Sequence, residues 1–205
     1  SPVRPKYGRL AARCRGPPPM SIRLPIQRAS VGPVRYTGPE RRVMDRRQAP
    51  IVEVRPTYAH VDAQALVHNL RTVQQAVGPR CRVLAVVKAD GYGHGAIEAA
   101  RTFVDAGAWG CAVSLVEEGV ELRQADVLAP VLVLGGVHPG SEDVIVHRSL
   151  TPVVWAREHL QLLAAAVRRS GAPPLPVHLK IDIGMSRLGA LPSQLPEVLD
   201  WFEGE

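Results

Sequence analysis

The feature that most constrains this chain is an apolar run that ends in one lysine and is followed by glycines. Residues 83–87 read Val-Leu-Ala-Val-Val, Lys88 follows them, and residues 89–95 read Ala-Asp-Gly-Tyr-Gly-His-Gly. Five consecutive apolar residues between turn formers predict a strand buried on both faces, as in parallel sheets covered by helices. Lys88 then lies at the carboxyl end of this strand, where α/β enzymes hold their sites.

Lys88 has two interpretations from these residues alone. A single lysine at the end of a strand is commonly a solvated surface residue. Here, however, the glycines let the backbone turn tightly and approach a ligand closely, and Tyr92 offers a hydroxyl four residues after the amine. Because an amine at the end of a buried strand is costly to desolvate unless its charge is used, we interpret Lys88 as a reactive lysine close to an anion. For Tyr92 the alternative is a packed aromatic residue with its hydroxyl at the surface.

Strand-like and helix-like segments alternate through the rest of the chain. Apolar runs predict further strands at 109–113, 131–134, 152–155 and 176–181, and helical spacing predicts helices at 96–106, 117–124, 141–147, 158–168 and 195–202. A helix before the first strand has Asp62 as its predicted N-cap. This alternation indicates consecutive βαβ units and a parallel sheet.

The number of units leaves two folds open. A (β/α)8 barrel takes about 250 residues, so residues 51–205 would form an incomplete barrel of about five of the eight βα units. The alternative is a flavodoxin-like open sheet, which is complete with five strands. We favour the α/β TIM-type barrel because of the motif resemblance described below.

Residues 1–50 differ in composition from the remainder. They contain nine of the 19 prolines and 12 of the 25 Lys and Arg residues, with no helical or alternating apolar pattern. This composition predicts a disordered basic tail at 1–50 and a folded domain at 51–205. A basic arm that binds nucleic acid is the alternative for the tail. The domain has 13 Lys and Arg against 17 Asp and Glu, a net charge of −4, which argues against a nucleic-acid surface there.

The cysteines, the histidines and the apolar runs indicate whether the chain has disulfides, a metal site or a membrane segment. The three cysteines are Cys14, Cys81 and Cys111, an odd and widely separated set that suggests neither a disulfide framework nor a zinc site. The seven histidines show no paired spacing typical of metal ligands. No apolar run approaches the ~18 residues of a membrane span. We therefore expect a cytoplasmic protein without a metal site or membrane segment.

A second motif occupies residues 178–189, which read His-Leu-Lys-Ile-Asp-Ile-Gly-Met-Ser-Arg-Leu-Gly. Lys180 and Arg187 lie seven residues apart across a glycine turn, so a bending loop could bring their side chains together. If both point inward, an anion must lie between the two cations. The alternative is a solvated Lys180 with Arg187 in an ion pair with Asp182.

Both motifs, in this order, closely resemble those of the alanine racemases, enzymes that bind pyridoxal 5'-phosphate in a (β/α)8 barrel. The resemblance implies that Lys88 forms the Schiff base with the cofactor and then serves as one of two acid/base groups, and that Tyr92 donates to the cofactor phosphate. It implies that Arg187 binds the cofactor's phenolic oxygen and the substrate carboxylate, and that Lys180 is a candidate carbamylated lysine. The second motif departs from the family at Ile183, usually threonine, and at Ser186, frequently glycine.

The resemblance also implies a function. It predicts a homodimeric enzyme that interconverts L- and D-alanine and supplies D-alanine for peptidoglycan synthesis. It covers roughly residues 52–205, the first half of such an enzyme, and in the family the second catalytic base comes from a later domain. We therefore expect this chain to be an amino-terminal fragment that does not racemise alanine by itself. A broad-specificity racemase of the same family, a related barrel decarboxylase and a non-catalytic truncated remnant are the alternatives.

Overall fold

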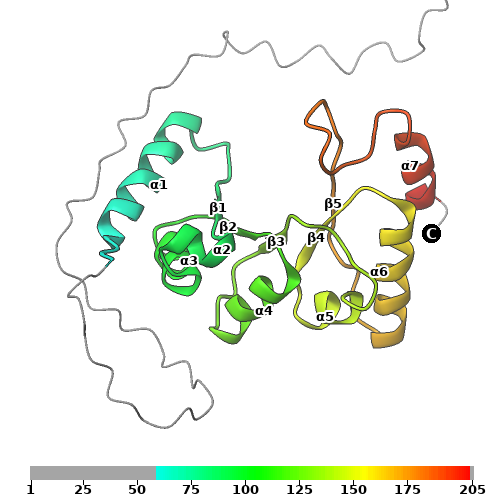
Figure 1. Ribbon diagram of the computed structural model, residues 1–205, viewed down its shortest axis with the longest axis horizontal. Helices are drawn as coiled ribbons and strands as arrows, with labels where there is room; N and C mark the ends of the chain where they lie inside the picture. Colours follow the sequence, from blue (N-terminus) through cyan, green and yellow to red (C-terminus); the bar gives the residue numbers. More distant parts are fainter. Residues whose placement is uncertain (1–58, 204–205) are drawn as a thin grey trace, which may run out of the picture.

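The computed structural model describes residues 59–203, which form a five-stranded parallel sheet with helices between successive strands (Figure 1). The strands are β1 (Leu84–Val86), β2 (Gly110–Val113), β3 (Val131–Val133), β4 (Thr151–Val154) and β5 (His178–Leu179). The helices are α1 (Ala63–Val77), α2 (Lys88–Gly93), α3 (Ala96–Asp105), α4 (Val116–Gln124), α5 (Glu142–His147), α6 (Arg157–Ser170) and α7 (Leu195–Glu203). The tail predicted at 1–50 lies outside the described residues.

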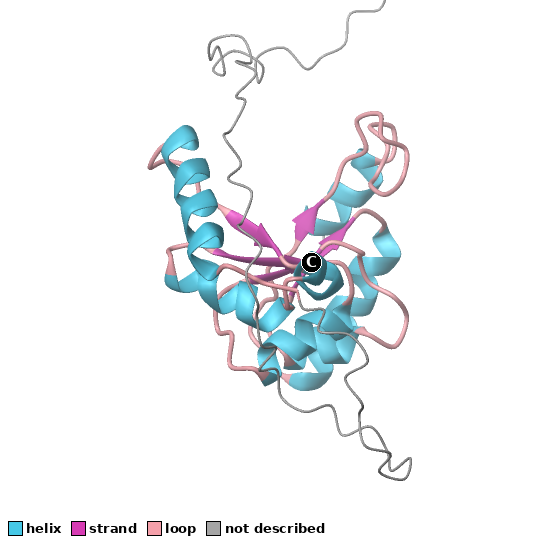
Figure 2. Ribbon diagram, turned by 60° about the vertical axis from the view of Figure 1, so that its left-hand side comes forward, coloured by secondary structure: helices cyan, strands magenta, loops and turns pink. Residues whose placement is uncertain are grey.

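The order of the strands decides between the two predicted folds. Each strand pairs in parallel with the one before it in sequence, in the order β1-β2-β3-β4-β5. A flavodoxin-like sheet has the order 2-1-3-4-5, because its chain reverses direction after the first unit. Here every crossover moves the same way, and Figure 2 shows most of the helices gathered on one side of the strands. The fold is therefore the predicted TIM-type barrel, and within residues 59–203 it is open, with β1 and β5 at its two edges.

The local signals in the sequence explain most of the helix boundaries. Asp62 is the N-cap of α1, as predicted, and its carboxylate accepts hydrogen bonds from the backbone N–H groups of Gln64 and Ala65 at 2.9 and 3.1 Å. The other predicted helices are confirmed with boundaries shifted by one or two residues. None of the helices within residues 59–203 is long and apolar enough to cross a membrane.

Two segments differ from the prediction. Residues 88–93, expected as a glycine loop, form the short element α2, whose backbone is left-handed at four consecutive positions. The strand predicted at 176–181 is shorter: β5 covers only His178–Leu179, and Ile181 makes a separate parallel bridge to Ala190. The chain leaves the sheet early at β5 because the backbone of Lys180 and Asp182 pairs with Ala190 on the returning loop, at 2.9 Å for each hydrogen bond.

The core lies between the sheet and the helices. Its largest fully buried side chains come from β2, β3, β4 and the helices and loops around them: Leu122, Ile145, Leu150, Val87, Val113, Val131, Val133, Val154, Pro152 and Cys111. The β-branched residues favour the strands, and β2 is buried along its whole length, as expected for a parallel sheet.

Arg123 holds the segments at the amino ends of β3 and β4. Its guanidinium donates hydrogen bonds to the carbonyl oxygens of Val127, Ala129 (2.8 Å), Arg148 (3.0 Å) and Ser149 (3.0 Å). One half-buried side chain thus joins the end of α4, the segment that leads into β3 and the segment that leads into β4. We call this set of contacts the Arg123 network.

The two cysteines in the described residues differ in their surroundings and provide a test of the core. Burial raises the pKa of the Cys111 thiol from 9.0 to about 11 and outweighs the opposing effect of the Arg123 cation, whereas Cys81 is exposed. The raised pKa alone lowers the thiolate fraction of Cys111 about 10²-fold at pH 8. We expect iodoacetamide to modify Cys81 rapidly and Cys111 only after unfolding, as read by peptide mapping with and without guanidinium. Rapid modification of Cys111 in the native protein would contradict this packing.

Candidate active site

Lys88 lies immediately beyond β1, at the edge of the sheet formed by the carboxyl ends of the strands. The β1–β2 pairing continues to Val87, whose N–H donates to the carbonyl of Ala112 at 2.9 Å, and the chain then turns away at Lys88. The Lys88 side chain is half-buried, and its Nζ lies 5.9 Å from the centroid of the Tyr92 ring. Within residues 59–203 the amine takes part in no ion pair and donates no hydrogen bond, so it is available to a ligand.

The backbone after Lys88 forms a left-handed turn that the sequence does not suggest. Ala89, Asp90, Gly91 and Tyr92 have φ values of 51°, 54°, 62° and 55°. Glycine adopts this conformation without a steric cost, but each of the other three residues costs roughly 1–2 kcal/mol relative to right-handed backbone. Conformations of this kind persist only where surrounding contacts enforce them, and they are concentrated at functional sites.

Two side chains of the turn fix its far end. The carboxylate of Asp90 accepts a hydrogen bond from the N–H of Ala96, the first residue of α3, at 2.9 Å. The Nδ1 atom of His94 lies 2.9 Å from the carbonyl oxygen of Gly91, so Nδ1 carries the proton in this contact. His94 therefore supports the turn through this contact.

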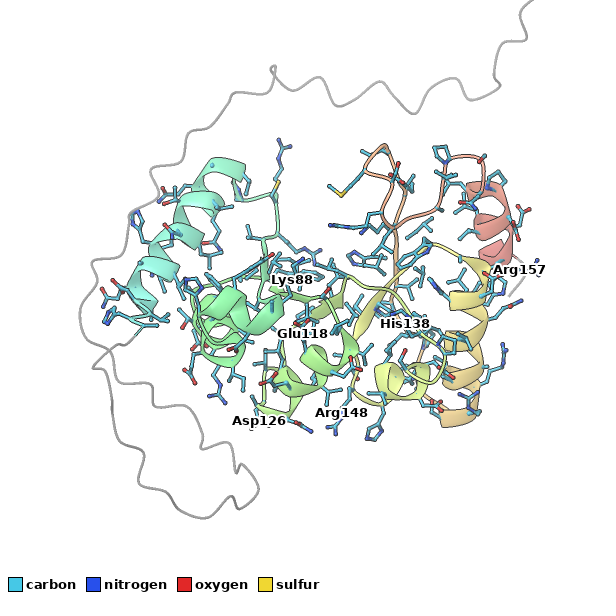
Figure 3. All side chains as sticks on the ribbon, viewed as in Figure 1. Lys88, Glu118, Asp126, His138, Arg148 and Arg157 are labelled. Carbon is cyan, nitrogen blue, oxygen red and sulfur yellow. The ribbon has the colours of Figure 1, made fainter. Side chains whose placement is uncertain are left out.

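Glu118, at the start of α4, fixes the near end of the turn. Its Oε1 accepts from the N–H of Ala89 at 2.6 Å, and its Oε2 accepts from Ser114 at 2.7 Å and Leu115 at 3.0 Å. Partial burial raises the pKa of this carboxyl, but the three N–H donors and the nearby Lys88 cation outweigh it, so the pKa lies below its ordinary value of 4.5. Glu118 is therefore an anion next to Lys88 at neutral pH (Figure 3).

The Tyr92 side chain is the large exposed apolar group of the turn. It is 61% exposed, so its hydroxyl can reach a ligand bound over the edge of the sheet. Gly93 and Gly95 follow with φ values of 84° and 86°, and an added Cβ at either would meet nothing within 4 Å. The backbone after Tyr92 is therefore accessible, whereas Gly91 before it is buried against Ala96 and Ala99 of α3.

The second motif lies at the other margin of the same edge. Lys180 is half-buried directly after β5, and its N–H donates to the carbonyl of Val154 at 2.8 Å. Arg187 is exposed on the loop that returns to Ala190. Three strands separate β1 from β5, so in the open sheet Lys88 and Lys180 lie beyond the carboxyl ends of its two outer strands. In a closed eight-stranded barrel, strands 1 and 5 face each other across the mouth, where one ligand could lie between them.

Asp182 organises the loop without Arg187. Its carboxylate accepts hydrogen bonds from the N–H groups of Gly184 at 2.9 Å and Ser186 at 3.0 Å. These two donors lower the pKa of Asp182 below its ordinary value, and Lys180 contributes a smaller effect in the same direction. No ion pair joins Asp182 to Arg187 in the part of the chain that the structure describes, so the predicted alternative of such a pair is not supported. Arg187 remains available for another anion.

The fold and this edge define a class: an α/β barrel protein with a lysine-centred site at the carboxyl ends of its strands. Sequence comparison gives the family. The family model described as alanine racemase, N-terminal domain, matches residues 61–203. The chain belongs to the alanine racemase family.

Individual relatives agree. The alanine racemase of Synechocystis sp. is 46% identical over 133 residues, which cover 64% of this chain and 36% of that protein. The alanine racemase of Sorangium cellulosum is 42% identical over 152 residues, covering 71% of this chain and 40% of that protein. The chain thus matches about two fifths of the length of these relatives.

Solved structures give the same result. The crystal structure of alanine racemase from E. faecalis has a TM-score of 0.64 and 35% identity, covering 71% of this chain and 40% of that one. A histidine racemase from Leuconostoc mesenteroides has a TM-score of 0.64 and 26% identity, covering 69% of this chain and 38% of that one. The same barrel is therefore found in racemases that differ in their named amino acid.

Proposed function

We propose that this chain provides the cofactor-binding part of an alanine racemase that uses pyridoxal 5'-phosphate and acts through Lys88. The observation that carries the proposal is the position of the half-buried residue Lys88, which precedes a left-handed turn at the carboxyl edge of a barrel sheet and whose amine has no ion-pair or hydrogen-bond partner among residues 59–203. The proposal also rests on membership in the alanine racemase family.

The residues at this edge have the chemistry that the cofactor requires. When bound, pyridoxal 5'-phosphate supplies an aldehyde that can bond covalently to a lysine and a ring that stabilises negative charge at the substrate α-carbon. Lys88 provides the amine, and Tyr92 provides an exposed hydroxyl that can donate to the phosphate. Arg187 provides a planar fork of donors for the phenolic oxygen and the substrate carboxylate.

Lys88 then moves a proton at one face of the substrate α-carbon. Racemisation needs a proton donor on each face, because one group cannot take and return a proton on opposite sides. We propose that the group for the other face is supplied from outside the 205 residues of this sequence, and that Lys180 is carbamylated and carries a negative charge toward Arg187. The domain assignment of residues 51–205 as the barrel part, the homodimer, the cytoplasmic location and the supply of D-alanine for peptidoglycan belong to the same proposal.

A second candidate is racemisation of another amino acid. The similarity to a histidine racemase supports it, because a similar barrel occurs in a protein with that named substrate. The lysine chemistry would be the same in both cases, and the two candidates differ only in the side chain that is accepted.

Borohydride reduction and a substrate panel test both candidates. Reduction of the full-length protein with bound cofactor, followed by peptide mapping, is expected to label Lys88 alone. Incubation of L-alanine and a panel of other L-amino acids is expected to yield the D-enantiomer fastest from alanine. Label on any other lysine would refute the role of Lys88. A faster reaction with histidine or another amino acid would favour the second candidate.

Arg187→Lys tests the donor geometry of the second motif. Lysine keeps the charge but offers a single ammonium where arginine offers a planar fork, so two acceptors would be satisfied poorly. We expect a loss of roughly 10²-fold in turnover, the order found when one positioned donor is removed. The measurement is steady-state racemisation of L-alanine, with unchanged thermal unfolding as the control. An unchanged rate would place Arg187 outside the site.

A further inference from the structure

We infer that Glu118 is a positioning residue for Lys88: its carboxylate clamps the left-handed turn to the loop after β2 and so fixes the base of the lysine side chain. The inference rests on the proposed function of Lys88 and adds a residue that the motif resemblance does not include. Figure 3 labels both residues, which lie near each other where β1 and β2 end.

The contacts go beyond an ordinary helix cap. Glu118 is the third residue of α4, a position from which a glutamate can accept from the N–H of the N-cap residue, here Leu115. That role uses only Oε2. Oε1 reaches Ala89, 29 positions earlier in the sequence, through the shortest of the three hydrogen bonds at 2.6 Å. One carboxylate therefore joins the ends of two neighbouring strands.

The Ala89 N–H is the group through which the clamp acts on the lysine. Ala89 is the residue directly after Lys88 and the first of the four left-handed residues. A left-handed alanine is unfavourable by itself, so a strong charge-assisted hydrogen bond at this position helps to keep the chain in that conformation. The opposite end of the turn has its own anchor, since the carboxylate of Asp90 accepts from Ala96.

The consequence is a fixed relation between Lys88 and Tyr92. The turn holds the Tyr92 ring 5.9 Å from Nζ of Lys88. If Ala89 were released, the turn could relax toward right-handed backbone, and the directions of both side chains would change. Proton transfer at the substrate α-carbon depends on such alignment, because small displacements of a catalytic group slow the chemical step.

Glu118→Gln tests the clamp with the smallest change in shape. An amide has one acceptor oxygen, so its NH₂ group must face either the N–H of Ala89 or the N–H groups of Ser114 and Leu115. Glu117→Gln is the matched control: it removes the same charge one residue away, from an exposed side chain that takes part in no hydrogen bond to the turn. Glu118→Asp is the second variant, because it keeps the charge but is too short to span both loops.

The first measurement is amide hydrogen exchange of the cofactor-free, full-length protein. We expect exchange in residues 88–95 to become about tenfold faster in Glu118→Gln and Glu118→Asp, with Glu117→Gln unchanged from the wild type. The second is the isotope effect on racemisation of α-deuterated alanine, which we expect to rise in the two Glu118 variants because proton transfer by a displaced Lys88 limits the rate more strongly. A loss of folded protein alone would leave the isotope effect unchanged, because it lowers the rates with both isotopes equally.

The outcomes separate this inference from the proposed function. Unchanged exchange and an unchanged isotope effect in both Glu118 variants, with an active wild type, would overturn the clamp. Faster exchange without a change in the isotope effect would reduce Glu118 to a structural cap and would also overturn it. An inactive wild type that is not labelled at Lys88 would refute the proposed function, and exchange of residues 88–95 would still decide whether Glu118 holds the turn.

Discussion

Replacement of Lys88 by alanine is expected to abolish racemisation and the covalent attachment of pyridoxal 5'-phosphate. In the proposed function the amine is both the bonding group for the cofactor and a proton-transfer group, so the variant is expected to lose both contributions. Loss of a positioned acid/base group alone costs 10²–10⁴-fold, and we expect a total decrease of at least about 10⁴-fold in turnover. The measurements are racemisation of L-alanine and the absorbance of the lysine–cofactor adduct.

Lys88→Arg separates the covalent role from the charge. Arginine keeps a cation beside Glu118 and Tyr92, so the electrostatic surroundings of the turn are retained, but its guanidinium remains protonated and does not form the adduct. We expect Lys88→Arg to be as inactive as Lys88→Ala while its circular dichroism and thermal unfolding match the wild type. Activity in Lys88→Arg above one tenth of the wild-type rate would contradict a covalent role for this residue.

The fold was predictable because its signals are local and repeated. Apolar runs such as 131–134 and the N-cap at Asp62 mark element boundaries within one or two residues of those observed. The strand order was not contained in these signals, because periodicity identifies strands but not their neighbours. The barrel was favoured over the flavodoxin-like sheet on the resemblance of two motifs, and the observed order β1-β2-β3-β4-β5 confirms it.

The candidate site was predictable in its residues but not in its backbone. Lys88 and Tyr92 are visible in the motif, whereas the left-handed conformation of Ala89 and Asp90 is not, since neither residue favours it strongly enough to signal it alone. The turn instead makes tertiary contacts at both ends, from Ala89 to Glu118 and from Ala96 to Asp90. The motif also does not show that three strands separate Lys88 from Lys180 in the open sheet, because that separation depends on strand order.

Glu118 was missed for a specific reason. The usual capping pattern, a serine followed three residues later by a glutamate, pairs Ser114 with Glu117. The structure starts α4 at Val116, with Leu115 and not Ser114 as the N-cap, so Glu118 occupies the third helical position. A search for acidic residues in the first turn after each strand would have found both glutamates, but only the contact with Ala89 distinguishes them.

The Arg123 network predicts the largest effect on stability. Methionine at position 123 keeps the apolar stem but removes donors to four carbonyl groups. Hydrogen bonds from a charged donor contribute about 1.5–3 kcal/mol each, and water can replace part of this at a half-buried position. We therefore expect Arg123→Met to lower the free energy of unfolding by about 3 kcal/mol, measured by urea unfolding followed by circular dichroism.

Arg157→Met is the control for this prediction. Arg157 is exposed at the start of α6, where a cation is unfavourable to the helix dipole, so its removal should change the free energy of unfolding by less than about 0.5 kcal/mol. Arg148, which belongs to the Arg123 network, and Asp126 lie at the lower edge of the molecule in Figure 3, away from Lys88. Because the amino ends of barrel strands serve stability and the carboxyl ends serve function, labelling of Lys88 per folded molecule should persist in Arg123→Met. An equal free energy of unfolding in the two variants would show that water replaces the hydrogen bonds of Arg123 without loss of stability.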